Sequence, residues 1–344
     1  MTAKRISLKL PQPLTDVVAA SVSPFAALSK FVDPSGKLNF AGKAAVHRNG
    51  VDFSNGTSYK ISMDELELVR ILGRGQYGVV QLVTHKPTNV RMAMKEIRLE
   101  LDETKMNHIV MELQVLNSSH NPHIIDFYGA FFIESCVYMC MEYMDGGSLD
   151  RLNAGGIPEP ILSKIALSVI KGLHFLKTEL LVIHRDVKPT NILINTAGQI
   201  KLCDFGVSGQ LVQSLAKTNI GCQSYMAPER IATRNAGVYT ARSDVWSVGI
   251  SIVELGTGFY PFPGDAYDSV FAQLNAIVSA EPPRLPDDKF SDEARDFVAK
   301  CLVKDPNARP TYPDLLATPW LVKAETAQVD VGAWVTEALV RQRK

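Results

Sequence analysis

The sequence predicts an α+β fold in which a strand-rich unit with one main helix precedes a larger, mostly helical unit. Strand-like segments, two of them joined by a glycine-rich turn, follow one another between residues 66 and 143. Beyond that point apolar residues recur at helical spacing, as in residues 161–176. The apolar stretch 245–262 contains Glu254 and several small residues, so it is interpreted as a buried core helix, and no membrane insertion is expected.

Composition narrows the class of protein before any motif is considered. The 344 residues are 46% apolar, which is enough for a substantial core and excludes a wholly disordered chain. Lys plus Arg equals Asp plus Glu at 36 each, and no basic tract occurs, so nucleic acid is not an expected partner. Five cysteines without a C-x-x-C pair indicate reduced thiols and a cytoplasmic location.

Residues 1–60 are predicted to form a flexible N-terminal arm, because Pro, Ser, Gly, Ala and Asn dominate and periodicity is poor. Within the arm, Lys4 and Arg5 precede Leu8 and Leu10. An extended peptide of this kind could place its cations on an acidic patch and its leucines in apolar pockets of a partner. A disordered tail with chance spacing is the alternative.

A glycine-rich turn separates the first two predicted strands, residues 66–72 and 81–84. It contains Gly73, Gly75 and Gly78, which would let the backbone approach phosphate groups closely. A dinucleotide-binding fold would require a helix directly after the glycines. Val80 instead belongs to a second strand, which favours a hairpin that covers a nucleotide.

The next strand, residues 92–97, carries a lysine that alternation places inside a cleft. Ala93 and Lys95 lie on the same face of this strand. A buried lysine needs an anionic partner, and the predicted helix over residues 105–116 offers Glu112. The sequence therefore predicts a Lys95–Glu112 ion pair, although an unpaired surface glutamate would be the reading of Glu112 alone.

Two further strands, residues 126–133 and 137–143, complete the first unit after a break at residues 121–125, where another strand begins. Residues 141–144 connect it to the helical unit and are a plausible place for an adenine to meet backbone groups.

A polar loop, residues 184–191, lies between two predicted short strands, 180–183 and 192–194. Its residue types suit phosphoryl transfer: Asp186 to accept a proton from a hydroxyl, Lys188 to neutralise a phosphate, and Asn191 to bind a metal. A further strand, 200–203, ends on Asp204, a carboxylate suited to Mg²⁺ near phosphates.

Taken in order, these segments resemble the protein kinase family over about residues 64–322. The resemblance implies a bilobal fold, with an N-lobe over 64–143, a C-lobe over 144–322, and ATP between them. It implies that Asp186 is the catalytic base, that Lys188 touches the γ-phosphate, and that Asn191 and Asp204 bind Mg²⁺. The implied ATP-binding residues are Leu72, Gly73, Gly75, Gly78, Val80, Ala93, Lys95, Glu112, Met141, Glu142 and Met144.

The same resemblance assigns structural roles in the C-lobe. Glu229 closes the activation segment in the triplet 227–229 and would pair with Arg309. Asp244 would anchor the catalytic loop from the buried helix. Arg185 precedes the base and could answer phosphorylation of the activation segment.

Residues 207–212 and 224–226, with Cys203 before Asp204, resemble the MAP kinase kinases. That family carries two phosphoacceptors in this loop, which here are Ser214 and Thr218. Together they would add roughly three to four negative charges when phosphorylated. Residues 214–226 are most similar to the fungal osmostress (high-osmolarity glycerol) member. Cys222, where many kinases carry threonine, and an arm shorter than that member's are departures.

The resemblance implies a dual-specificity enzyme that phosphorylates Thr and Tyr in the T-x-Y segment of a MAP kinase, is activated by an upstream MAP kinase kinase kinase, and could bind a scaffold. A catalytically weak scaffold of the same fold is the alternative. One site that accepts two kinds of side chain needs docking elsewhere, which favours Lys4, Arg5, Leu8 and Leu10 as a docking arm. Residues 317–340, including most of a C-terminal tail over 323–344, would either dock the upstream kinase or simply pack on the C-lobe. The apolar candidates are Trp320, Leu321, Trp334, Val335 and Leu339.

Overall fold

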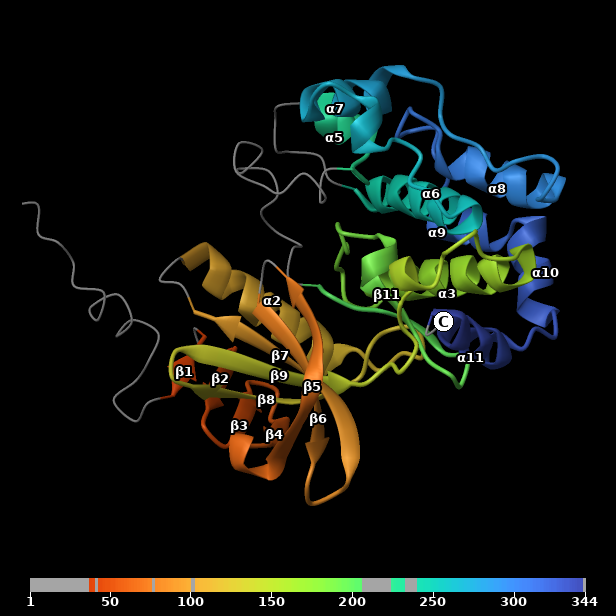
Figure 1. Cartoon of the computed structure of the whole chain (residues 1–344). Coiled ribbons are helices and arrows are strands. Elements are labelled where there is room, and N and C mark those ends of the chain that lie inside the picture. The colour runs from red at the N-terminus through yellow and green to blue at the C-terminus, as the bar shows by residue number, and fades with distance from the viewer. Residues whose placement is uncertain are drawn as a thin grey trace, which may run out of the picture.

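The structure is a computed structural model, which describes residues 37–40, 43–75, 78–99, 103–205, 224–232 and 240–342. A smaller lobe contains most of the strands and helix α2, and a larger lobe is built mainly from helices (Figure 1). The predicted α+β, bilobal class is therefore confirmed. None of the helices within these ranges combines the length and apolar character needed to cross a bilayer.

The smaller lobe is built on an antiparallel sheet of five strands in the order β5-β6-β7-β9-β8. Met92 and Met94 of β7 face a small core on one side of this sheet. Ala93 and Lys95 alternate with them and therefore face the other lobe, as the sequence predicts. The strands are β5 (Leu66–Gly75), β6 (Gly78–His85), β7 (Val90–Arg98), β8 (Phe127–Ile133) and β9 (Cys136–Glu142), and α2 spans Glu103–Ser118.

A second sheet precedes the first and corrects the prediction of a flexible arm over residues 1–60. Strands β1 (Leu38–Asn39), β2 (Ala44–His47), β3 (Gly50–Phe53) and β4 (Ser58–Lys60) form one antiparallel sheet in that order.

This sheet packs against β8, where Tyr59 contacts the rings of Phe53 and Phe127 at centroid distances of 6.2 and 5.1 Å. Val46 and Val51 are fully buried, so the prediction of flexibility is wrong for residues 37–60. Alternating apolar residues outweigh the polar composition there. The four predicted docking residues, Lys4, Arg5, Leu8 and Leu10, lie outside the described residues.

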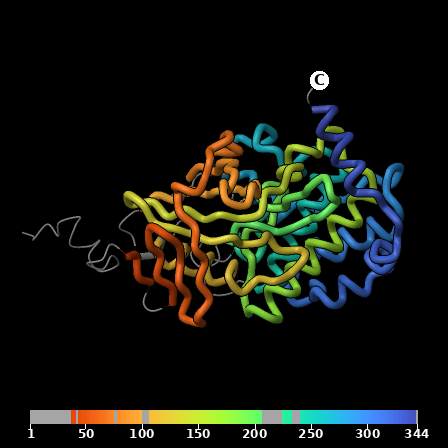
Figure 2. Tube along the Cα trace, turned by 90° about the horizontal axis from the view of Figure 1, so that it is seen from below, coloured from red at the N-terminus to blue at the C-terminus, as the bar shows by residue number. Residues whose placement is uncertain are grey.

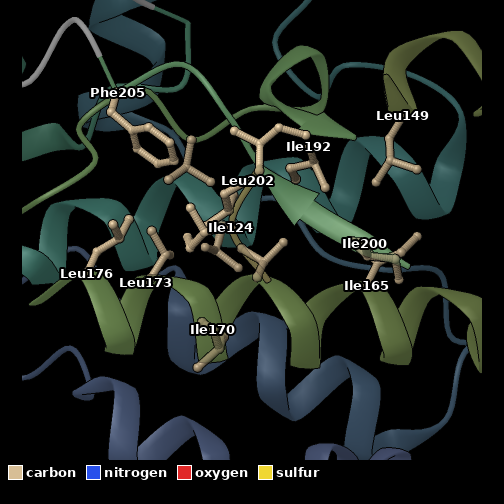
Figure 3. Packing of buried hydrophobic residues seen from close by; sticks show 14 of the residues in the cluster. Ile124, Leu149, Ile165, Ile170, Leu173, Leu176, Ile192, Ile200, Leu202 and Phe205 are labelled. Atoms are coloured by element: carbon tan, nitrogen blue, oxygen red, sulfur yellow. The ribbon is translucent and has the colours of Figure 1, made fainter. Parts of the chain in front are cut away.

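The larger lobe is organised around α3 (Glu159–Thr178), which packs against α6, α9 and α10. Leu173 and Leu176 of α3 lie beneath Ile124 and Leu202 (Figure 3). The predicted core helix is α6, which ends at Gly258 in a left-handed conformation, so the apolar run to residue 262 is not one helix. The other helices of this lobe are α5 (Pro228–Ala232), α6 (Ala241–Thr257), α7 (Val270–Ser279), α8 (Asp292–Cys301), α9 (Tyr312–Leu316), α10 (Pro319–Thr326) and α11 (Val331–Gln342).

Three short strands form a small separate sheet: β10 (Gly147–Ser148), β11 (Ile192–Ile194) and β12 (Ile200–Leu202). The predicted strand over residues 180–183 is absent: Leu181 has φ +56° and is 87% exposed, so the chain turns there. Residues 121–125 contribute only a bridge from Ile124 to Leu202 and begin no strand. Short 3₁₀ turns are η1 (Met63–Glu65), η2 (Leu149–Arg151), η3 (Pro189–Asn191) and η4 (Gly264–Ala266).

The C-terminal residues are part of the larger lobe. Helix α10 crosses the predicted boundary between domain and tail at residue 322. Trp320, Leu321 and Val335 are buried in the main core, so these three side chains cannot form an exposed docking surface. Figure 1 draws the end of α11 near the chain that connects the two lobes, and Figure 2 shows that this end lies at the edge of the larger lobe.

Candidate active site

A cleft of about 360 Å³ lies between the five-stranded sheet and the larger lobe. Both lobes and the connector between them contribute to its walls. Of the predicted ATP-binding residues, the structure brings nine to this cleft: Leu72, Gly73, Val80, Ala93, Lys95, Glu112, Met141, Glu142 and Met144. The two residues predicted to bind a metal, Asn191 and Asp204, also line it.

The roof of the cleft is the hairpin of β5 and β6, which Gly75 and Gly78 close as a facing pair. Neither glycine lines the cleft itself. Gly78 has φ +139°, and a Cβ built on it would lie 1.7 Å from the carbonyl oxygen of Glu96. The beginning of β6 can therefore pair with β7 only because residue 78 is glycine.

Lys95 joins three elements across the cleft. Its Nζ lies 2.8 Å from Glu112 Oε1 on α2 and 3.1 Å from Asp204 Oδ1 beyond the end of β12. The Lys95 and Glu112 side chains are only 10% and 4% exposed, so the predicted ion pair is present and buried. A single ammonium thereby holds the helix of the small lobe to the floor of the cleft.

The two carboxylates set the charge of this group. Burial alone would lower the pKa of Lys95, but Asp204 and Glu112 together outweigh burial and hold that pKa well above its ordinary value. Burial would likewise raise the pKa of Asp204, but the neighbouring Lys95 ammonium holds it below the usual range. Lys95 and Asp204 are both charged at neutral pH. The Lys95 cation could bind a phosphate, and the Asp204 carboxylate could bind a metal ion.

The polar loop that ends at Asn191 is fixed from below by Asp244 of α6. The backbone N–H groups of His184 and Arg185 donate to the Asp244 carboxylate at 3.0 and 2.9 Å. Asp244 and His184 are fully buried. The predicted anchoring role of Asp244 is thus present as two charge-assisted hydrogen bonds.

Three polar side chains converge within this loop. Lys188 Nζ lies 2.8 and 3.0 Å from the carboxylate oxygens of Asp186. Asn191 Nδ2 donates to the carbonyl oxygen of Asp186 at 2.7 Å and to its Oδ2 at 2.9 Å. The Asp186 carboxylate is therefore held in one orientation next to a cation, as a positioned proton acceptor requires.

The donor set of the cleft fits a hard divalent cation. Asn191 offers an amide oxygen and Asp204 a carboxylate. Mg²⁺ in nucleotide sites takes oxygen ligands, commonly one or two carboxylates together with substrate phosphates and water. The residues present can supply the protein's share of such a site.

The connector between the lobes, residues 141–144, lines the cleft. The Glu142 side chain is paired with Lys201 at 2.6 Å, and Lys201 also reaches Asp126 at 2.9 Å. Since Lys201 is 4% exposed, this pair ties the connector to β12 within the interior. The Glu142 side chain is thus engaged by Lys201, and the contact of an adenine with backbone groups of this connector stays a prediction.

Several residues of the cleft were not foreseen from the sequence. Leu193 of β11 and Cys203 contribute to its floor, and Arg151, Leu339 and Gln342 contribute from η2 and α11. Burial, reinforced by the Asp204 carboxylate, raises the pKa of the Cys203 thiol far above its ordinary value, so that this thiol is neutral at physiological pH. Alternation along β11 could have identified Leu193. No local pattern in α11 points to the cleft.

The predicted regulatory residues Ser214 and Thr218 lie outside the described part of the chain. Arg185, predicted to respond to them, follows His184 with φ +71°. Glu229, at the end of the activation segment, forms the predicted pair with Arg309 through two hydrogen bonds of 3.0 Å. The Arg309 side chain is fully buried.

Comparison with known proteins agrees with this geometry. Residues 66–321 match the protein kinase domain family. The chain is 58% identical over 329 residues to the MAP kinase kinase PBS2 of Saccharomyces cerevisiae and 53% identical over 343 residues to the protein kinase wis1 of Schizosaccharomyces pombe. It is 43% identical over 305 residues to the dual specificity mitogen-activated protein kinase kinase dSOR1 of Drosophila melanogaster.

These matches cover most of this chain but different shares of the relatives. The aligned regions span 93%, 98% and 81% of the chain, and 49%, 56% and 76% of the three relatives in the same order. The chain thus spans about half the length of the two fungal relatives.

Proposed function

Because the chain belongs to the MAP kinase kinases within the protein kinase family, we propose that it transfers the γ-phosphoryl group of ATP to a threonine and a tyrosine in the T-x-Y segment of a MAP kinase. The stress-responsive branch is the proposed pathway, because residues 214–226 resemble the fungal osmostress member. The reduced cysteines favour action in the cytoplasm.

In this proposal ATP occupies the cleft with its adenine against the connector and its phosphates beneath the β5–β6 hairpin. Val80 and Ala93 flank the adenine, and backbone groups of Glu142 and Met144 bind its edge. Lys95 holds the α- and β-phosphates, because its ammonium is buried and fixed by Glu112 at 2.8 Å. Gly73, Gly75 and Gly78 let the hairpin approach the phosphates.

Phosphoryl transfer then depends on the loop below. Asp186 accepts the proton of the substrate hydroxyl, and Asn191 keeps its carboxylate in place through the 2.9 Å bond. Lys188 turns from Asp186 toward the γ-phosphate as charge develops there. Mg²⁺ held by Asn191 and Asp204 would supply charge neutralisation for the phosphates when bound.

The observation that carries the proposal is the position of Lys95 between Glu112 and Asp204. Burying an ammonium between two carboxylates is costly even when the groups are paired, so such a cluster in a cleft is a candidate functional site. The proposal assigns the Lys95 cation to the phosphates of ATP and the Asp204 carboxylate to a metal ion.

The test is incubation with a panel of inactive MAP kinases, ATP and Mg²⁺, followed by mass spectrometry of the T-x-Y segment. We expect phosphate on both residues of at least one stress-type MAP kinase, and none with Asp186→Asn. Asp296→Asn, which alters an exposed carboxylate paired with Lys300, is the matched control and should behave as wild type. Binding of the MAP kinase without phosphate transfer by the activated protein would favour the scaffold alternative.

Regulation and partners complete the proposal. An upstream MAP kinase kinase kinase phosphorylates Ser214 and Thr218, and Arg185 responds to the added charge. Lys4, Arg5, Leu8 and Leu10 dock the MAP kinase, and a scaffold could hold the components together.

Replacing both Ser214 and Thr218 by alanine should prevent activation by the upstream kinase. Lys4→Glu with Arg5→Glu should raise KM for the MAP kinase and leave KM for ATP unchanged.

A further inference from the structure

We infer that the C-terminal helix α11 is part of the nucleotide site, where Leu339 forms a wall of the cleft and Gln342 positions the glycine-rich hairpin through Arg151. This inference rests on the proposed binding of ATP in the cleft. It assigns a nucleotide-positioning role to residues that follow the matched kinase domain, which ends at residue 321.

Leu339 and Gln342 line the same cleft as Lys95, Asn191 and Asp204, although they lie near the end of the described chain. Leu339 is half-buried and packs against the main core. Its neighbour Val340 is 50% exposed and does not line the cleft. The helix thus presents one apolar side chain to the cleft and another to solvent, and only the first can contact a nucleotide.

A chain of two hydrogen bonds connects α11 to the roof of the cleft. The side-chain amide of Gln342 donates to the backbone carbonyl of Arg151 in η2. The Arg151 guanidinium in turn donates to the carbonyl oxygen of Leu72, at 3.2 Å. Leu72 lies in β5 immediately before Gly73. A Cβ built on Gly73 would lie 3.8 Å from Nη2 of the same guanidinium. The height of the glycine-rich strand above the cleft is therefore supported from α11.

The base of α11 is seated closely enough to make such support stiff. A Cβ built on Gly146, just after the connector, would lie 2.9 Å from Val335 Cγ1, so the helix packs directly against the end of the connector. A Cβ built on Gly332 would lie 2.5 Å from the carbonyl oxygen of Thr196, in the turn between β11 and β12. The absence of side chains at these two glycines lets α11 approach both the connector and the floor of the cleft.

Two consequences distinguish this role from simple packing. Removal of the Leu339 side chain should weaken nucleotide binding without changing affinity for the MAP kinase, because only the nucleotide meets this wall. Removal of the Gln342 amide should act only through Arg151. Among the described residues, the Arg151 carbonyl oxygen is the one hydrogen-bond acceptor that this amide contacts.

The experiment measures the Kd of ATP for the full chain by isothermal titration, together with KM for ATP and for the MAP kinase. We expect Leu339→Ala to raise the Kd of ATP about threefold to tenfold, the range that one lost apolar contact produces, and Gln342→Ala to raise it about twofold, because its hydrogen bond to Arg151 is exposed. KM for the MAP kinase should stay at the wild-type value. Leu339→Ala should lower the thermal midpoint without nucleotide only slightly, because its side chain is half-buried, and Gln342→Ala should leave that midpoint unchanged. Val340→Ala, on the solvent side of the same helix, is the control and should change nothing.

A double-mutant cycle tests the path through Arg151. Arg151→Ala removes the guanidinium and retains the carbonyl that Gln342 meets, so Gln342→Ala should have no further effect in that background. Additive effects would overturn the path. A Kd within twofold of wild type for folded Leu339→Ala would overturn the wall. If wild type binds no ATP at all, the proposed function fails and this inference fails with it. If wild type binds ATP and the variants bind it with the wild-type Kd, only this inference fails.

Discussion

The catalytic loop and the glycine-rich hairpin face each other across the cleft, but they are held in different ways. The loop rests on buried groups: Asp244 and His184 are fully buried and connected by a 3.0 Å hydrogen bond. The hairpin carries Leu68, Val69 and Ile71 in the open, each about half exposed. Its ties to the rest of the molecule include exposed hydrogen bonds from Arg70 to Tyr143 and from Arg151 to Leu72.

In the proposed function the catalytic loop needs a fixed geometry, whereas the hairpin must be able to change its position. Hydrogen bonds to a buried carboxylate are shielded from water and costly to break, which keeps the proton acceptor in one geometry. Exposed hydrogen bonds exchange with water at little cost. In the proposed function the hairpin opens for each nucleotide and benefits from weak ties, whereas the loop that performs the chemistry does not. Substitutions on the two sides of the cleft test this contrast.

The largest effect is expected at Asp186. Asp186→Asn keeps the shape of the side chain but removes the proton acceptor, so kcat should fall about a hundredfold to ten-thousandfold. The Kd of ATP should be almost unchanged, because Asp186 does not line the cleft. Single-turnover kinetics and titration of ATP measure the two quantities. Unchanged turnover would reject Asp186 as the base.

Arg309→Met should cost about 3–5 kcal/mol of unfolding free energy, because it leaves the largely buried Glu229 carboxylate without the cation that balances its charge. The Arg309 side chain is fully buried and Glu229 is 17% exposed. Denaturant unfolding gives the value. Arg295→Met is the matched control: its partner Asp292 is 92% exposed, so the loss should stay within about 1 kcal/mol. Equal losses would contradict the assignment of rigidity to the buried pair.

Gly78→Ala should raise KM for ATP about tenfold, because the new Cβ would clash with Glu96 and force the hairpin off β7. Gly56 offers the comparison, since it too has a positive φ, +87°, but nothing lies within 4 Å of a Cβ built there. Gly56→Ala should cost stability through the backbone alone and leave KM unchanged. A KM effect at both positions would point to general destabilisation.

The smallest effect is expected at Arg70, whose guanidinium donates to the Tyr143 hydroxyl at 3.2 Å on the surface. Arg70→Ala should change KM for ATP by about twofold or less, because water replaces an exposed hydrogen bond. Steady-state kinetics at several ATP concentrations is sufficient. A tenfold change would show that the cover is held as tightly as the loop beneath it, and the contrast would fail.

Much of the site could be predicted because its parts are local in sequence. Alternation in β7 placed Ala93 and Lys95 on the cleft side, and helical spacing offered Glu112 as the partner. The pattern failed at residues 37–60, where polar turns obscured four short strands, and at residues 180–183, where an apolar run forms no strand. Short elements depend on what covers them, and composition does not record that.

By itself the sequence determined the fold class, the order of most elements from residue 64 onward and the residues proposed to act in phosphoryl transfer. Each of these follows from spacing along a strand, a helix or a single loop. The tertiary structure alone decided that Trp320, Leu321 and Val335 face the core and that α11 reaches the nucleotide cleft. Gln342 and Arg151 are 191 residues apart, and such a contact is set by how whole helices pack, because no local periodicity specifies it.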